Sequence, residues 1–257
     1  MLVRYLALGA ALLLGAAPLT AQTATLTATE HIAMGDHAHD SLDAPAAYLN
    51  YKEAVTLEPN NYEALWKAAR EAVDLGEYEP DNAKQKQFYD EGLEYAKRAE
   101  AANPNDAEGH FHVARALGRV ALSLGKKERV HYAKEIRQEA LTALRIDSLH
   151  PGALHVMGRW NAEIMRLSGL SRFFARNFLG GDVFGEASWK NAVSYMEKSV
   201  QQDPNRLVHH LDLAEIYADV GQKDKARAEF EAVINGKATD YNDAHYKEQA
   251  QKDLAKL

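Results

Sequence analysis

Apolar residues recur along the chain with helical spacing, and short turn signals interrupt the pattern at intervals. Four of these signals share the same character: Glu58-Pro59-Asn60, Asn103-Pro104-Asn105, Asp147-Ser148 and Asp203-Pro204-Asn205. Each one closes a helical apolar pattern and opens another. We find no convincing strand pattern between them. The chain is therefore predicted to be all-α and to consist of repeated helical hairpins.

The last repeat fits the 34-residue tetratricopeptide unit when the turn proline takes its thirty-second position. The repeat then begins at Leu207, and its template positions hold Leu213, Ala214, Tyr217, Gly221 at the turn, Ala226, Phe230 and Val233. The same small-large-small pattern appears in the second helix of two other repeats, as Ala47, Tyr51 and Ala54 and as Ala192, Met196 and Ser199. Small residues there let the helices of a hairpin approach closely, while the larger ones fill the gap between hairpins.

The repeats are not evenly spaced, because the turns at positions 59, 104, 148 and 204 lie 45, 44 and 56 residues apart. Insertions are therefore expected at about 77–87, where residues 79–82 break the helix, and at 167–188. Around 123–129 the insertion should lengthen both helices, with Gly125 at the corner. We predict a tetratricopeptide-like helical hairpin solenoid, wound as a right-handed superhelix with a C-terminal capping helix. Its hairpins should begin near Glu30, Glu63, Ala107, Pro151 and Leu207, and the capping helix should run from about Asn242 to Lys256.

The N-terminus predicts export. Residues 1–4 form a short basic region, residues 5–18 are apolar, and Leu19-Thr20-Ala21 offers a small residue at the expected cleavage point. We expect residues 1–21 to be a signal peptide, 22–42 an N-terminal segment with the first helix, and 43–257 the repeat domain with its long insertion at 167–188. The cleaved chain should then lie in the periplasm or outside the cell.

Composition excludes several kinds of site and partner. The chain has no Cys, so a disulfide framework, a Cys zinc site, a thiol nucleophile and a thioether-linked lipid anchor are excluded. The apolar N-terminal stretch is shorter than the roughly 20 residues of a membrane-spanning helix, and no later segment is long and uncharged enough. The 30 Lys and Arg against 37 Asp and Glu give a net charge of −7, which makes nucleic acid a poor partner.

One stretch resembles a known family. Residues from His155 to Arg176, which include Gly158-Arg159-Trp160, and the following Asn177-Phe178-Leu179-Gly180 resemble the signature of the regulator of microtubule dynamics family. Residues 64–70 and 109–114 are similar to earlier repeats of the same family, so that the resemblance spans most of residues 45–235.

This resemblance implies a tetratricopeptide-like fold without known enzymatic chemistry. In eukaryotes it implies association with microtubules and, in one branch, with phospholipids at organelle contacts. The present chain differs from the eukaryotic pattern because it has a cleavable-looking signal in place of a membrane anchor or a long N-terminal extension. Because an exported chain does not reach microtubules, the sequence favours a bacterial periplasmic relative.

The concave face of such a solenoid is lined by the first helix of each hairpin. Counting along these helices places an arginine at the ninth position of three successive repeats: Arg70, Arg115 and Arg159, which we call the arginine row. Other positions of the same face hold Trp66, Phe111, His155 and Leu211 at fifth positions, Glu215 at a ninth, and Arg119 and Glu163 at thirteenth positions. A guanidinium group binds carboxylate or phosphate at two points, so this face is predicted to hold an extended peptide with acidic groups or an anionic lipid-like ligand. The predicted ligand-binding residues are Trp66, Arg70, Phe111, Arg115, Arg119, His155, Arg159 and Glu163.

A structural explanation stands beside the ligand-binding one. The arginines can instead pair with neighbouring acids and brace the solenoid, the candidates being Glu71, Asp74, Glu163 and Glu215. Trp66 and Phe111 can pack between hairpins as core residues. The insertion offers a similar choice, because its phenylalanines can form a lid, contact a membrane or pack over a helix end; they are Phe173, Phe174, Phe178 and Phe184, with Arg172 and Arg176 beside them.

Three functions remain open on these observations. The first is a non-catalytic binding or scaffold protein of the cell envelope, with a protein or peptide partner or an anionic lipid. The second is a structural assembly module that stacks on another envelope protein. The third is a metal-dependent enzyme, for which the densest histidine group is His31, His37 and His39 with Asp40, although that spacing does not bring the rings to one helix face. We predict no catalytic residue, no metal site and no cofactor.

Overall fold

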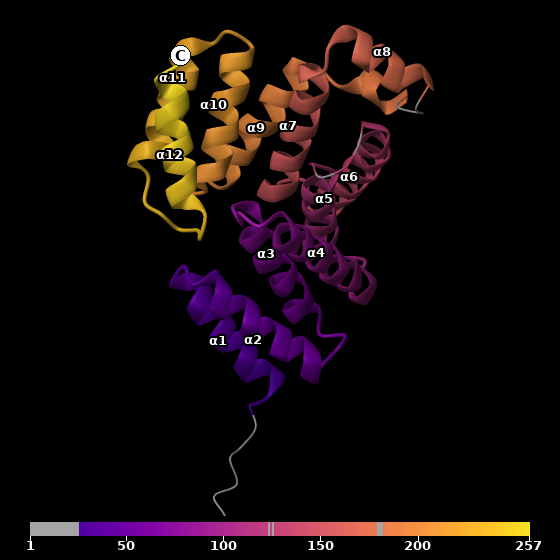
Figure 1. Cartoon of the computed structure of the whole chain (residues 1–257), viewed down its shortest axis with the longest axis vertical. Coiled ribbons are helices and arrows are strands. Elements are labelled where there is room, and N and C mark those ends of the chain that lie inside the picture. Colours follow the sequence, from indigo (N-terminus) through magenta and orange to yellow (C-terminus); the bar gives the residue numbers. More distant parts are fainter. Residues whose placement is uncertain (1–25, 123, 125, 179–181) are drawn as a thin grey trace, which may run out of the picture.

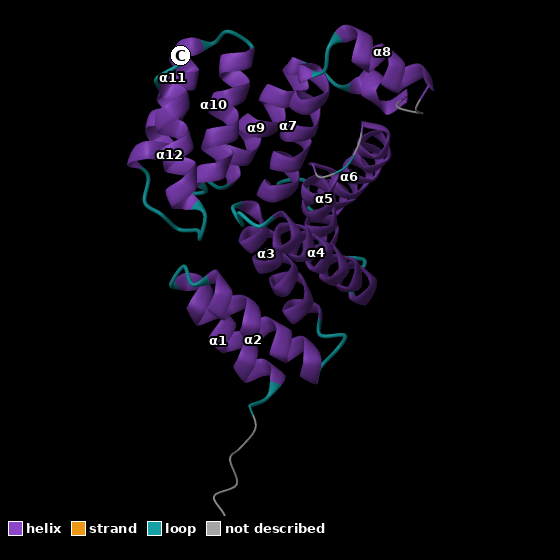
Figure 2. Cartoon of the chain, in the orientation of Figure 1, coloured by secondary structure: helices purple, strands orange, loops and turns teal. Residues whose placement is uncertain are grey.

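The computed structural model describes residues 26–122, 124, 126–178 and 182–257, and this part of the chain is helical without any strand (Figure 2). The helices in chain order are α1 (Ala28–Asp40), α2 (Ala44–Leu57), α3 (Tyr62–Glu77), α4 (Asn82–Ala102), α5 (Ala107–Leu122), α6 (Lys126–Ile146), α7 (Pro151–Arg166), α8 (Gly169–Phe178), the 3-10 helix η1 (Asp182–Glu186), α9 (Trp189–Gln202), α10 (Leu207–Asp219), α11 (Lys223–Asn235) and α12 (Asp243–Leu254). The all-α prediction is therefore confirmed.

The helices begin where local capping chemistry favours them. Thr27 and Glu30 form a reciprocal capping box at the start of α1, in which Thr27 accepts from the Glu30 amide at 3.2 Å and donates its own amide to the Glu30 carboxylate at 2.8 Å. Asp43 and Asn61 cap α2 and α3 by accepting from the amide three residues on, each at 3.0 Å. These side chains satisfy amides that have no partner within the helix.

Successive helices pack as antiparallel hairpins, α1 with α2, α3 with α4, α5 with α6, α7 with α9 and α10 with α11, and α12 packs on α11 (Figure 1). The first helix of each hairpin begins at a residue close to its predicted start. The fold is thus a tetratricopeptide-like solenoid of helical hairpins. None of the described helices is long and apolar enough to cross a membrane. The predicted signal peptide, residues 1–21, lies outside the described residues.

Small-large-small triplets hold the hairpins together as the sequence predicted. In α2, Ala47, Tyr51 and Ala54 are fully buried, and Tyr51 reaches so close to α1 that a β-carbon at Gly35 would lie 2.4 Å from its ring. A β-carbon at Gly158 of α7 would lie 2.9 Å from the Cε atom of Met196 in α9. The Tyr51 ring is fully buried and rigid, so the close approach of α1 and α2 depends on the absence of a methyl group at Gly35.

The insertions differ in detail from the sequence prediction. The loop between α3 and α4 covers only residues 78–81, and the remaining extra residues lengthen α4 to 21 residues, because Asp81 caps a new helix through the amides of Ala83 and Lys84. At the second insertion, where longer helices were predicted, α6 is 21 residues long. Its predicted corner, Gly125, lies outside the described residues.

The long insertion at 167–188 contains α8 and η1 (Figure 1). Phe184 of η1 is buried and meets the Trp160 ring edge-to-face with centroids 6.2 Å apart, which anchors the end of the insertion on α7. Phe173 is 56% exposed, and the Arg172 guanidinium contacts the Met165 sulfur at 2.9 Å. The side chains of Phe174, Arg176 and Phe178 lie outside the described residues.

Candidate binding surface

The arginine row occupies successive first helices, with Arg70 on α3, Arg115 on α5 and Arg159 on α7. Each of the three guanidinium groups has a carboxylate partner. Arg70 donates from Nε to the adjacent Glu71 at 2.8 Å. Arg115 pairs with Asp74 of α3, and Arg159 pairs with Asp212 of α10. Two of these pairs therefore join one hairpin to the next.

The Arg115–Asp74 pair lies inside the protein. The Asp74 side chain is 1% exposed and that of Arg115 is 15% exposed. Burial raises the pKa of Asp74 to about 6, with Asp240 and Glu71 adding to the effect, although the Arg115 guanidinium acts in the opposite direction. A carboxylate in this position has little access to water, so loss of its arginine partner would leave it uncompensated.

A second buried acid, Asp212, joins α10 to α7. It accepts from the Arg159 guanidinium through one oxygen and from His155 Nε2 at 2.5 Å through the other. Burial raises the pKa of Asp212, but these two partners outweigh it and hold the pKa well below its usual range. Burial also lowers the pKa of His155, so its ring is neutral at pH 7 and donates from Nε2. The His155 ring stacks on His209 with centroids 4.8 Å apart.

A third set of contacts brings the C-terminal part of the chain onto α3 (Figure 1). Arg119 of α5 pairs with Glu77 at 2.6 Å, and Glu77 also accepts from the Tyr246 hydroxyl of α12 at 3.0 Å. The Asn242 side-chain amide donates to the Asp74 backbone carbonyl at 2.9 Å. Charged and polar side chains thus connect α3, α5 and α12 at one place.

The predicted aromatic residues lie between hairpins. Trp66 stacks on His112 with centroids 5.6 Å apart, and the Arg70 guanidinium lies 5.3 Å from the Trp66 ring centroid. Phe111 is partly buried and lies 4.9 Å from His150. Burial lowers the pKa of His112 to about 4, so this ring is also neutral. The row of rings therefore packs as a continuous contact from α3 to the start of α7.

The α7 end of the surface that carries the arginine row is open to solvent. Glu163 is 51% and Arg159 37% exposed at the side chain, and both belong to α7. Arg166 completes the group by pairing with Glu163 at 2.6 Å and Asp219 at 2.7 Å. These three α7 side chains are therefore within reach of a partner, unlike Arg115 and Asp74.

Glu100, His110 and Glu139 place ligand atoms within 4.8 Å of one another, which is a candidate cation site. However, His110 Nε2 contacts the Pro104 carbonyl at 3.0 Å and Nδ1 contacts Glu139 at 2.7 Å. Burial lowers the pKa of His110, but its hydrogen bonds to Glu139 and to the Pro104 carbonyl raise the pKa overall, which favours an ion pair of the ring with Glu139 over metal ligation.

The same arrangement recurs one hundred residues later in the last hairpin. His210 contacts the Pro204 carbonyl at 2.9 Å through Nε2 and Glu229 at 2.6 Å through Nδ1. We call these two arrangements the proline clamps, because each ties the turn proline to the second helix of its own hairpin. Their recurrence indicates a structural role within the repeat.

All eight predicted ligand-binding residues lie on the first helices α3, α5 and α7. The structure brings Trp66 and Arg70 together, and Phe111 lies in the aromatic row, while Arg159 and Glu163 form the open end. Their role as ligand-binding residues stays a prediction. The sequence identified Glu71, Asp74 and Glu163 as partners of the arginine row but missed Asp212. Asp212 lies between Leu211 and Leu213, and an acidic residue within such an apolar pattern could have indicated a buried ion pair.

Solved structures share this architecture. A tetratricopeptide-repeat protein of Thermus thermophilus superposes with a TM-score of 0.60 at 17% identity, covering 88% of this chain and 100% of that chain. PilF of Pseudomonas aeruginosa gives a TM-score of 0.51 at 14% identity, covering 90% of this chain and 91% of that chain. At this level of identity the likeness shows the fold alone.

Relatives by sequence carry one name. Regulator of microtubule dynamics protein 1 of Bos taurus is 26% identical over 180 residues, covering 68% of this chain and 55% of the relative. The protein of the same name from Pongo abelii is 27% identical over 186 residues, covering 71% and 57%. The chain thus spans about half the length of these curated relatives. The family model described as regulator of microtubule dynamics protein 1-3 matches residues 31–257, and the chain therefore belongs to that family.

Proposed function

We propose that this chain is a non-catalytic scaffold of the cell envelope that holds an extended, acidic segment of a partner protein against its first-helix face. The observation that carries the proposal is the arginine row in register on α3, α5 and α7, beside the Trp66 ring. Arg159, at the open end, offers the most accessible guanidinium of the row, at 37% exposure against 18% for Arg70 and 15% for Arg115. Carboxylates of a peptide would replace the exposed Glu163 as its partner.

The envelope location rests on the signal-peptide pattern of residues 1–21. Expression of the full chain in a bacterium with a Sec pathway should yield a product that begins after Ala21, and mass spectrometry of the purified protein measures that directly. A product that retains residues 1–21 contradicts export.

An anionic lipid-like ligand would use the same guanidinium groups of the arginine row. The mass of the bound molecule distinguishes such a lipid from a peptide.

The ligand test compares three proteins by native mass spectrometry: the parent, Arg159→Gln, and the double variant Lys84→Gln with Lys237→Gln, whose residues are exposed and lie outside the arginine row. Arg159 is chosen because substitution of the buried Arg115 would disturb folding. A bound mass that is present in the parent and the double variant but absent in Arg159→Gln supports the proposal. A parent without any bound mass, or a mass retained in Arg159→Gln, contradicts it.

A second function, a structural assembly module that stacks on another envelope protein, is favoured by one observation. Arg70, Arg115 and Arg159 all have carboxylate partners within the described part of the chain. In that case Arg159→Gln lowers the urea midpoint without changing any association. Circular dichroism of the parent and the variant during urea unfolding separates the two functions.

A further inference from the structure

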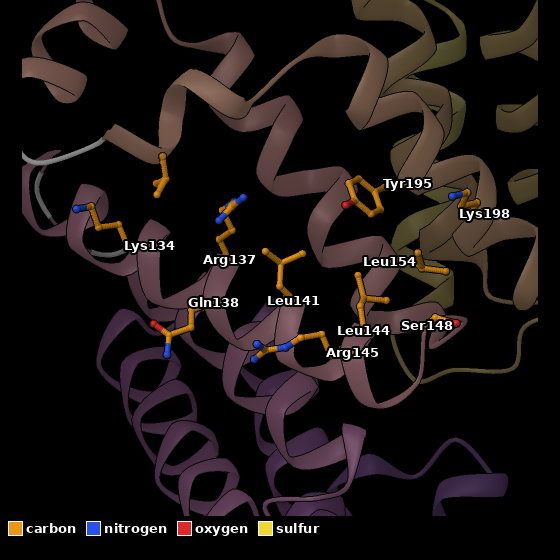
Figure 3. A pocket seen from close by; sticks show the side chains of 11 residues that line it. Lys134, Arg137, Gln138, Leu141, Leu144, Arg145, Ser148, Leu154, Tyr195 and Lys198 are labelled. Carbon is orange, nitrogen blue, oxygen red and sulfur yellow. The ribbon is translucent and has the colours of Figure 1, made fainter.

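A groove lies between the second helices α6 and α9, and its floor comes from α7 (Figure 3). Its volume is about 690 Å³. Apolar side chains form the inner part, with Leu141 and Leu144 from α6, Leu154 from α7 and Tyr195 from α9. Leu154 is only 2% exposed, so the floor is recessed below the rim. The two walls come from α6 and α9, which carry no residue of the arginine row, while α7 contributes Leu154 to the floor and Arg159 to the arginine row.

The rim of this groove is basic in an acidic protein. Four cationic side chains surround the apolar floor: Lys134, Arg137, Arg145 and Lys198. Lys134 pairs with Asp182 at 3.0 Å and Arg137 pairs with Glu186. Within the described residues, Arg145 donates only to the Thr142 hydroxyl, at 2.7 Å, and no carboxylate pairs with Lys198. Arg145 and Lys198 therefore give the rim a net positive charge, although the chain as a whole has a net charge of −7.

One donor of the rim lacks a partner altogether. The Nε atom of Arg137 is buried and has no hydrogen-bond acceptor within the described structure, while its guanidinium lies 5.6 Å from the Trp160 ring centroid. Because this atom is buried, an occupant of the groove would meet the rim through the exposed Arg145 and Lys198 instead.

The shape of the groove follows one face of α6. Lys134, Arg137, Leu141, Leu144 and Arg145 lie along α6 at helical spacing, and the stretch from residue 134 to residue 145 extends ~16 Å at ~1.5 Å per residue. A linear stripe of this kind matches about three turns of a second helix laid along it. A flat membrane surface does not reach a floor as recessed as Leu154, whereas side chains projecting from a helix do.

We propose that this groove binds an acidic amphipathic helix of a partner protein, whose apolar residues enter between Leu141, Leu144 and Tyr195 and whose carboxylates meet Arg145 and Lys198. The proposed helix-binding groove is separate from the arginine row, and a separate experiment tests it. A membrane or a free anionic lipid is the competing occupant.

The probe is a fluorescein-labelled synthetic peptide of about 14 residues, with Leu on one helical face and Glu on its flanks, measured by fluorescence anisotropy with the full chain. A peptide of the same composition in scrambled order is the first control. The test variant is Arg145→Glu with Lys198→Glu. The matched variant, Lys84→Glu with Lys237→Glu, reverses the same number of exposed charges outside the groove.

The test variant should bind the patterned peptide at least about ten-fold more weakly, a change of about 1.4 kcal/mol, while the matched variant stays within about two-fold of the parent. Raising NaCl from about 0.05 M to about 0.5 M should weaken binding by the parent, because rim charges are screened. Equal affinity for the scrambled peptide, equal loss in both variants, or binding to vesicles of phosphatidylglycerol in phosphatidylcholine but not to the peptide would overturn the proposal.

Discussion

The side-chain amide of Asn242 donates to the backbone carbonyl of Asp74 at 2.9 Å, across 168 residues of sequence. This bond joins the start of α12 to α3, and Asn242 is fully buried. The Tyr78 and His245 rings stack beside it with centroids 4.1 Å apart. A solenoid otherwise gains its stability from neighbouring repeats, so this long-range contact couples the unfolding of the C-terminal cap to that of the second hairpin.

Substitution of Asn242 tests this coupling. Asn242→Ala should lower the free energy of unfolding by about 1–3 kcal/mol, because the Asp74 carbonyl loses a buried donor. Hydrogen exchange should also become faster at the C-terminal end of α3, where the contact is made. Asn235→Ala, at the end of α11, is the control and should change stability by no more than about 0.5 kcal/mol. Unchanged exchange in α3 would show that the C-terminal cap and the second hairpin open independently.

Replacing one member of the buried Arg115–Asp74 pair should destabilise the chain more than replacing both. Arg115→Met should destabilise the chain by about 3–5 kcal/mol, because it leaves an unpaired carboxyl group in the interior. The double variant Arg115→Met with Asp74→Leu should recover to within about 1 kcal/mol of the parent, since neither charge remains. Urea unfolding monitored by circular dichroism measures both. If the single and double variants lose the same stability, the cost comes from packing and not from the unpaired charge.

The proline clamp of His210 predicts a pH dependence of known sign. The hydrogen bond to Glu229 raises the pKa of His210, with the Pro204 carbonyl acting in the same direction. A raised pKa in the folded state means that the clamp contributes fully below the unfolded pKa of about 6.5 and that this contribution is lost as pH rises through the folded pKa.

His210→Gln should therefore destabilise the chain at pH 6 by about 1 kcal/mol and much less at pH 9. NMR titration of the His210 ring in the parent should give a pKa above about 6.5. Buried histidines with lowered pKa values, such as His112, contribute to stability with the opposite pH dependence. Their contribution is the same in the variant and the parent, so it cancels when the two are compared at each pH. A His210 ring that titrates below the ordinary histidine value would contradict the clamp.

Glycine packing gives a prediction with a built-in control. Gly35→Ala should cost about 1–3 kcal/mol, because its β-carbon would lie 2.4 Å from the fully buried Tyr51 ring. Gly118→Ala, inside α5 with nothing within 4 Å of its β-carbon, should instead stabilise the chain by about 0.5–1 kcal/mol. Thermal unfolding of the two variants shows the contrast. Equal effects at both positions would mean that the α1–α2 contact tolerates expansion.

The helical hairpins and their starts follow from the sequence alone, because capping residues and small-large-small triplets act over a few residues within one hairpin. Gly221 illustrates this, since its φ of 76° is the left-handed backbone that the turn position of the template requires. The position of the arginine row on the first helices was also predictable, because the helical period determines which residues share a face.

The partners of those residues depended on tertiary structure. Asp212 reaches Arg159 across 53 residues and Asn242 reaches Asp74 across 168, and no local pattern encodes how far the solenoid curves. The groove between α6 and α9 has the same origin, since Leu144 and Tyr195 face each other only after α7 has packed between their helices. Local periodicity determined the helices and their faces, while the curvature set by many packed contacts decided which charges are paired and which stay open.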